Sequence, residues 1–242
     1  MGIQLMQDRI KWWQISLMLA VVGLLAIGVA IFWEGVRANQ VVANRLKCQS
    51  QLKLISLAMH DYHKVHGHFP PAHVLGPDGK PWHSWRVLLL GYTPEDALYR
   101  DYNFNEPWDG PNNSKLQARM PKFFACPSDP DNLKKGRTNY FAVVGPDTAF
   151  PGAKPTKFDD ITRSRADTIL LVEAVGQDIN WMEPRDLSFD NMSFHFDDPS
   201  IPSVSSKHRA ANVVMVDGTI WNVHGKSPLE VRTMFLIRDP AK

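Results

Sequence analysis

The chain has 242 residues, with 27 lysines and arginines against 25 aspartates and glutamates. The resulting formal net charge of +2 at pH 7 provides no electrostatic reason to bind nucleic acid, so we expect no nucleic-acid partner. The 18 prolines and 15 glycines argue against a helical bundle and indicate a loop-rich protein. The 2 cysteines permit one disulfide bond or two free thiols.

Residues 12–33 form an uncharged segment with tryptophan at both ends, WWQISLMLAVVGLLAIGVAIFW. A helix rises about 1.5 Å per residue, so a helix of this length crosses the ~30 Å hydrocarbon layer of a bilayer, and terminal indole rings favour its interfaces. We therefore predict a flank over residues 1–11, one transmembrane helix over residues 12–33 in contact with the lipid bilayer, and a soluble domain over residues 34–242. A cleavable signal peptide is the alternative, although the apolar run continues beyond the small residues 26–28 that would form a cleavage site.

An apolar stripe predicts that the helix continues beyond the membrane. Its members recur at steps of four and three residues, which places them on one helical face: Cys48, Leu52, Ile55, Met59 and Tyr62. Gly67 and the Pro70-Pro71 pair supply a stop signal. The pattern predicts a helix from about residue 10 to residue 66 whose second half packs on the soluble domain, with two or three shorter helices as the alternative.

Strand signals are concentrated in the second half of the chain. Residues 69–139 lack clear periodicity, apart from a predicted helix start at Pro94. Short β-branched runs bounded by turn residues follow at residues 140–144, 169–175, 212–216 and 219–223. The last two runs flank Asp217-Gly218, which predicts a type I′ hairpin turn with positive φ at both residues. The pattern favours a loop-rich α+β fold with the long N-terminal helix packed on an antiparallel β-sheet.

Histidines gather at the end of the predicted helix: His60, His63, His66 and His68, with Asp61 among them. His60 and His63 are helical neighbours, as two metal ligands would be, which raises the alternative of a membrane-tethered metal-binding or hydrolytic enzyme using the His60–His68 cluster. The simpler interpretation places His63 at the edge of the buried face and the other histidines on the helix end. We favour this interpretation and expect no bound metal here.

Two further groups of residues have both a functional and a structural interpretation. The oxygens of Asp129, Asp131 and Asn132 suit calcium, although a solvated acidic loop is the interpretation that we favour. A set of tryptophans would provide a glycan- or peptide-binding surface if exposed, but we favour a role in the core or in pinning loops. This set contains Trp82, Trp85, Trp108, Trp181 and Trp221.

Sequence motifs give no support for catalysis. The chain has no Gly-x-Ser-x-Gly motif, no phosphate-binding glycine-rich loop and no dinucleotide fingerprint. Asp217 would suit a catalytic carboxylate, but a turn accounts for both Asp217 and Gly218, since Asp bonds the local backbone and Gly tolerates positive φ. We therefore expect no catalytic residues, no cofactor and no enzymatic activity.

Several segments, taken in order, resemble type IV pilins and type II secretion pseudopilins, and more specifically a large bacterial pilin-like family of unassigned function. The matching segments are residues 48–71, 84–92, 107–113, 123–129, 139–145 and 208–220, the last of which carries a motif running from His208 to Asp217-Gly218. The resemblance implies a structural or interaction role in the bacterial cell envelope, with other envelope or pilin-like proteins as partners.

The resemblance also bears on processing and location. Prepilins of this kind have a Gly before a Phe-x-x-x-Glu pattern. Here Gly2 is followed by Ile3, and no glutamate stands at the fifth position after Gly2, so we expect the anchor to be retained. Flanking charges do not decide the orientation, and we favour the periplasmic or extracellular side for the soluble domain. There Cys48, on the buried stripe, would be able to meet Cys126 in a disulfide.

Overall fold

The computed structural model describes residues 2–208 and 210–239, with side chains from Trp12 onward. The chain divides into two compact units, residues 1–43 and residues 44–242. Helix α1 (Gly2–His66) is continuous, which confirms one long helix over the alternative of several shorter ones. It begins earlier than predicted and ends where predicted.

In the first unit, α1 exposes its apolar side chains all around the helix. Trp12 is 70% exposed, Leu24 69% and Trp33 56%. This is the one helix among the described residues that is long and apolar enough to cross a membrane, and a signal sequence near the N-terminus would meet the same criteria.

In the second unit, α1 buries the stripe that the sequence predicts. Cys48, Leu52, Ile55 and Met59 are fully buried and Tyr62 is nearly so. The helix ends because Gly67 adopts a φ of +76° and donates its N–H to the His63 carbonyl at 2.8 Å, a left-handed cap that glycine makes without strain.

The other elements are short, as expected for a loop-rich chain. The α-helices are α2 (Trp85–Leu88), α3 (Asp96–Asp101), α4 (Pro130–Lys134) and α5 (Pro228–Met234). The 3-10 helices are η1 (Leu90–Tyr92), η2 (Asn113–Leu116), η3 (Lys122–Phe124) and η4 (Phe158–Asp160). The strands are β1 (His73–Leu75), β2 (Pro81–Ser84), β3 (Tyr140–Phe141), β4 (Val143–Val144), β5 (Ile169–Glu173), β6 (Leu187–Ser188), β7 (Asn212–Met215) and β8 (Ile220–Asn222).

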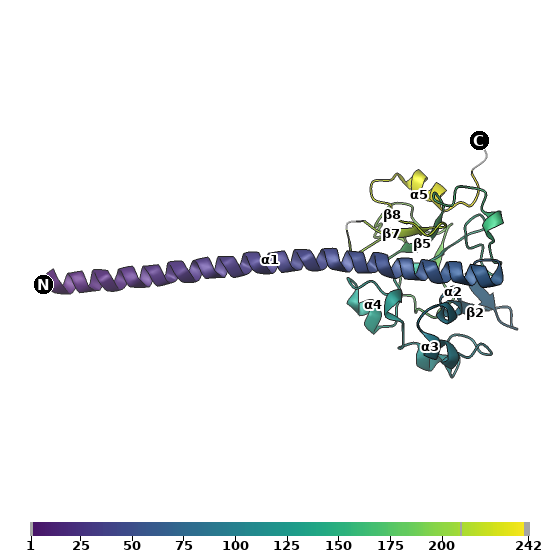
Figure 1. Cartoon of the computed structure of the whole chain (residues 1–242), viewed down its shortest axis with the longest axis horizontal. Coiled ribbons are helices and arrows are strands. Elements are labelled where there is room, and N and C mark those ends of the chain that lie inside the picture. The colour runs from purple at the N-terminus through teal and green to yellow at the C-terminus, as the bar shows by residue number, and fades with distance from the viewer. Residues whose placement is uncertain (1, 209, 240–242) are drawn as a thin grey trace. The chain divides into compact units, whose positions relative to one another are not determined.

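The main sheet has four strands in the order β3-β5-β7-β8, and every neighbouring pair is antiparallel. Alternate side chains point to opposite faces of a strand, so the sheet has two apolar faces. Leu171 and Val214 pack in the core that contains the buried stripe of α1, whereas Val172 and Val213 pack with Val231 of α5. Figure 1 accordingly shows α5 and the second-unit part of α1 on opposite sides of β5 and β7. The predicted α+β fold is thereby confirmed.

Two small sheets were not predicted. Strands β1 and β2 form an antiparallel hairpin inside the segment that lacked periodicity, and β4 pairs with β6 in parallel. The predicted strand over residues 140–144 is therefore divided between two sheets. The backbone N–H of Ala142, between β3 and β4, donates instead to Asp186 Oδ1 at 2.9 Å.

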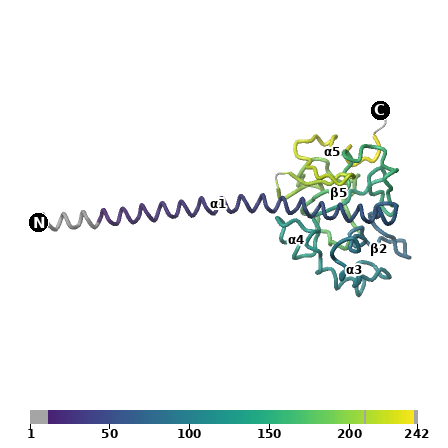
Figure 2. The backbone as a smooth tube through the Cα atoms, viewed as in Figure 1, coloured from purple at the N-terminus to yellow at the C-terminus, as the bar shows by residue number. Residues whose placement is uncertain are grey.

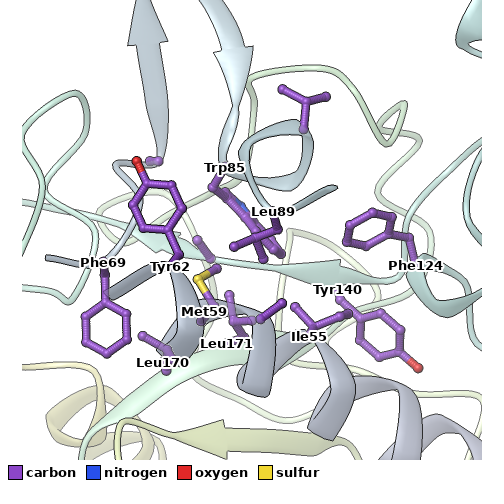
Figure 3. Close-up of a cluster of buried hydrophobic side chains, with 14 of the residues drawn as sticks. Ile55, Met59, Tyr62, Phe69, Trp85, Leu89, Phe124, Tyr140, Leu170 and Leu171 are labelled. Atoms are coloured by element: carbon purple, nitrogen blue, oxygen red, sulfur yellow. The ribbon is translucent and has the colours of Figure 1, made fainter. Parts of the chain in front are cut away.

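The larger core forms where α1 meets the rest of the second unit. Figure 3 shows Met59 and Tyr62 of α1 beside Trp85 and Leu89, with Leu171 of the main sheet close by. The backbone trace in Figure 2 shows α3 and α4 on the side of α1 away from α5 in this view. Buried apolar contacts thus tie the last turns of α1 to segments far away in the sequence.

Candidate functional site

A disulfide joins Cys48 of α1 to Cys126, which follows η3, and the two Cα atoms are 5.2 Å apart. Both cysteines are essentially inaccessible to solvent. Asn139, just before β3, accepts a hydrogen bond from the Cys126 backbone N–H through Oδ1 at 2.9 Å and so fixes the second cysteine's loop. The disulfide therefore links the buried face of α1 to the edge of the main sheet.

His208 lies against the disulfide. Its Nε2 atom is 3.5 Å from Cys48 Sγ and 3.6 Å from Cys126 Sγ. Its backbone N–H donates to Ser206 Oγ at 3.1 Å, which orients the residue. Burial lowers the pKa of His208, and the charge of Arg45 lowers it further, so the neutral imidazole is favoured. The other ring nitrogen, Nδ1, is buried without a hydrogen-bond partner among the described residues.

Glu173, the last residue of β5, completes the cluster as a fully buried carboxyl group. Its Oε1 accepts a hydrogen bond from Ser206 Oγ at 2.9 Å, and its Oε2 accepts from the backbone N–H and the Nδ2 of Asn212 at 3.2 and 3.0 Å. Burial raises the pKa of Glu173, while these hydrogen bonds and the charge of Arg45 act in the opposite direction. A buried carboxyl with three donors is held in one orientation.

We name the side chains of Cys48, Cys126, Glu173 and His208 the disulfide cluster. One ligand atom from each lies within 4.8 Å of every other, and among the described residues this is the only such group of three or more potential metal ligands. The sequence pattern points to both cysteines and to His208 separately, but not to Glu173. The available signal was a single acidic residue ending the otherwise apolar run of β5.

The side chains of the His60–His68 cluster pack against neighbouring groups of the protein. The Nδ1 and Nε2 atoms of His60 lie 2.7 Å from the Ser56 carbonyl and 2.9 Å from the Val216 carbonyl. The ring of His63 packs on Phe158, with centroids 4.1 Å apart, and burial lowers its pKa. The rings of His66 and His68 lie near Tyr62. Carbonyl oxygens face both nitrogens of His60, which leaves neither of them aimed at a common metal position.

The turn at Asp217-Gly218 differs from the predicted type I′ geometry. Gly218 has a φ of +85°, but Asp217 is not among the described residues with positive φ. The Gly218 N–H donates to the Met215 carbonyl at 2.8 Å, and the Met215 N–H donates to the Thr219 carbonyl at 2.9 Å. This pattern is a type I turn followed by a left-handed glycine, the common three-residue hairpin loop. Asp-Gly is compatible with either loop, so the dipeptide alone could not decide between them.

This turn docks on α1. Lys53 Nζ donates to the Gly218 carbonyl at 2.6 Å, and His60 reaches the carbonyl of Val216 beside it. Asp217 Oδ1 accepts from the backbone N–H of Thr219 at 2.8 Å and from its hydroxyl at 2.7 Å, so the carboxylate stabilises the loop itself. His208 and this turn therefore meet α1 at different places, the former at the disulfide and the latter nearer the helix end.

Gly218→Val is expected to lower the free energy of unfolding by about 1–3 kcal/mol, because a β-branched residue is strained at positive φ. The new Cβ would also lie 3.4 Å from Lys53 Nζ and from Ser56 Oγ. Denaturant unfolding of the full chain in detergent measures the effect. Asp217→Asn is the matched control and should be nearly neutral, because Asn serves the same turn. A Gly218→Val variant as stable as the wild type would contradict this role of the turn.

The remaining candidates lie in structural surroundings. Asp129 accepts a hydrogen bond from Asn139 Nδ2 at 3.2 Å, whereas Asp131 lies on α4 with its carboxylate 3.9 Å from Lys134 Nζ. Among the tryptophans, Trp85 and Trp181 are fully buried and Trp221 is 44% exposed. The other two tryptophans of the set, Trp82 and Trp108, are half-buried.

The fold and the disulfide define a disulfide-bonded α+β unit preceded by an apolar helix. Residues 42–176, more than half of the chain, match the model of the family described as "Protein of unknown function (DUF1559)", and the chain belongs to this family. The matched region contains both cysteines and Glu173 and ends before His208. No curated protein and no solved structure matches the chain.

Proposed function

We propose that the chain is a membrane-anchored, pilin-like structural or interaction protein of the bacterial cell envelope, without catalytic activity. The observation that carries this proposal is the exposed, uncharged apolar surface of α1 over residues 12–33. Such a surface is stable in lipid and unfavourable in water, since soluble proteins rarely expose contiguous apolar patches of this extent. The same continuous helix supplies the buried stripe of the second unit, an arrangement similar to that of pilins.

The disulfide supports a location outside the cytoplasm. Disulfides form and persist in oxidising compartments, and the Cys48–Cys126 bond joins two buried segments of the second unit. We therefore propose that residues 44–242 lie on the periplasmic or extracellular side. The resemblance of the motif from His208 to Gly218 to that of the bacterial pilin-like family supports the same placement.

Other envelope proteins, including further copies of this chain, are the proposed partners. After the uncharged segment, α1 still exposes large apolar side chains, with Val36 at 41%, Val41 at 59% and Val42 at 59%. Apolar residues exposed on a helix favour contact with a second helix. The rival functions receive less support, since His60 is engaged by carbonyl oxygens and Trp85 and Trp181 are buried.

Retention of the anchor is tested by the mass of the full chain extracted from membranes. We expect a mass that corresponds to a start at Met1 or Gly2, because the apolar run has no prepilin pattern and continues past its small residues. A start within residues 27–34 would show cleavage and contradict the anchor.

Replacing Leu24 and Leu25 together by arginine should move the protein out of the membrane fraction, since each arginine at a helix centre costs about 2.5–3.5 kcal/mol on insertion.

A matched control separates loss of insertion from a general effect of added charge. Val41→Arg with Val42→Arg adds the same charge outside the uncharged segment and should leave the protein in the membrane fraction.

Chemical cross-linking in intact membranes then tests the interaction role. We expect crosslinked species that these valine substitutions diminish, whereas a chain that yields only monomers in its native membrane would contradict the proposed partners.

A further inference from the structure

The disulfide cluster has the composition of a zinc site. Two sulfurs, one imidazole nitrogen and one carboxylate oxygen all lie within 4.8 Å of one another. Structural zinc sites use four such ligands in tetrahedral geometry. As long as the sulfurs are bonded to each other, neither is a thiolate, so the disulfide form does not offer this ligand set.

The position of His208 matches the distances that zinc imposes. With Zn–S of about 2.3 Å and Zn–N of about 2.0–2.1 Å at tetrahedral angles, the nitrogen lies ~3.6 Å from each sulfur. The observed distances from His208 Nε2 are 3.5 Å to Cys48 Sγ and 3.6 Å to Cys126 Sγ. The two sulfurs themselves must separate to ~3.8 Å once their bond is broken, which requires a change in a cysteine side-chain torsion.

We propose that reduction of the Cys48–Cys126 disulfide converts the disulfide cluster into a zinc site in which each of its four side chains supplies one ligand. A dithiol reductant breaks the S–S bond, giving up two electrons and two protons to form two cysteine thiols and becoming a disulfide itself. Zn²⁺ then binds both sulfurs as thiolates and displaces their two protons to solvent. The protein would thus hold a disulfide when oxidised and zinc when reduced.

The surroundings of the cluster suit this site. Nε2 of His208 faces the sulfurs, and Nδ1, which would carry the proton, is buried without a partner among the described residues. Oε1 of Glu173 accepts one hydrogen bond, from Ser206, and so keeps lone-pair capacity for a metal. Two thiolates and a carboxylate leave the zinc site with one net negative charge. The nearby positive charge of Arg45, whose field acts on both Glu173 and His208, offsets it.

The test compares the oxidised and the reduced full chain in detergent. Each form is equilibrated with zinc chloride alone, freed of excess metal and analysed for zinc per chain. We expect about one zinc per reduced chain and less than 0.1 per oxidised chain. Cobalt chloride alone should give thiolate-to-cobalt charge-transfer absorption only after reduction. A reduced chain that binds no zinc, or that gives no such absorption, overturns the proposal.

Variants assign the ligands. His208→Ala and Glu173→Gln should each weaken zinc binding by the reduced chain at least tenfold, whereas His224→Ala, the removal of an exposed histidine, should not change it. If reduction unfolds the second unit, zinc should restore its circular dichroism, and failure to do so contradicts the proposal. Equal zinc binding by His208→Ala and wild type would show that the zinc lies elsewhere. None of these results depends on whether α1 anchors the protein.

Discussion

Replacing Cys48 and Cys126 together by alanine is expected to lower the free energy of unfolding by about 4 kcal/mol. The disulfide closes a loop with a sequence separation of 78 residues. In the chain-entropy model a loop of this length restricts the unfolded chain by about 4 kcal/mol, and removal of native disulfides from small domains costs about 2–5 kcal/mol. A loss of this size is comparable to the whole stability of many domains, so the variant should be at the margin of folding.

Tryptophan fluorescence during denaturant unfolding measures this loss, because Trp85 and Trp181 are fully buried in the second unit. Wild-type protein reduced in the absence of zinc is the control and should lose a similar amount, since it lacks the same crosslink. Ser50→Ala, on the exposed part of α1, should change the free energy of unfolding by less than about 0.5 kcal/mol. Unchanged midpoints for both the alanine variant and the reduced protein would contradict a stabilising disulfide.

Zinc connects this prediction to the proposed site. A ligand that binds only the folded chain raises its stability by about 2.7 kcal/mol at a hundredfold excess over the dissociation constant. Zinc added to the reduced wild type should therefore recover a large part of the loss. The double cysteine variant has no thiolates to bind the metal, so zinc should leave its stability unchanged.

Local patterns were sufficient to predict α1 and the main sheet. The stripe from Cys48 to Tyr62 has a helical period, and every one of its members is buried. The runs that became β5 and β7 are apolar and bounded by turn residues, and they pair at the centre of the sheet. In both cases the signal lies within one short window of sequence, which is where periodicity carries information.

The unpredicted features depend on contacts between distant residues. Glu173 belongs to the disulfide cluster only because β5 ends beside β7 and the segment before it, more than thirty residues later in the chain. No local pattern distinguishes Glu173 from an ordinary solvent-exposed acidic residue at the end of a strand. The hairpin of β1 and β2 was missed because its residues show neither a helical nor a strand period.

The buried ion pair of Arg86 and Asp186 was also not predicted. Arg86 Nη2 and Asp186 Oδ1 are 2.5 Å apart, with side chains 0% and 1% exposed. Asp186 also accepts hydrogen bonds from Trp85 Nε1 at 3.1 Å and from the backbone N–H of Ala142, while Arg86 Nη2 donates to the Tyr140 carbonyl at 3.1 Å. The pair therefore joins α2, β3 and the segment before β6. A sequence shows which charged residues lie in apolar segments, but not which of them form an ion pair in the fold.

Asp186→Ala is accordingly expected to lower the free energy of unfolding by about 3–5 kcal/mol, because it leaves the guanidinium of Arg86 buried without its counter-charge. It also removes the acceptor of the Trp85 and Ala142 donors, which have no access to water. Asp190→Ala is the matched control, since Asp190 is an exposed aspartate four positions away, and its effect should stay below about 0.5 kcal/mol. Denaturant unfolding of the full chain compares the two variants.

A second variant distinguishes the cost of an unpaired charge from the loss of packing. Arg86→Met combined with Asp186→Leu removes both charges and keeps apolar volume at the two positions, so it should be more stable than Asp186→Ala. If the double variant is as unstable as Asp186→Ala, the hydrogen bonds to Trp85, Ala142 and Tyr140 carry the contribution instead of the charge pair. If Asp186→Ala itself lies within about 1 kcal/mol of the wild type, water must reach Arg86, and the junction between α2 and the sheet is less tightly packed than its zero exposure indicates.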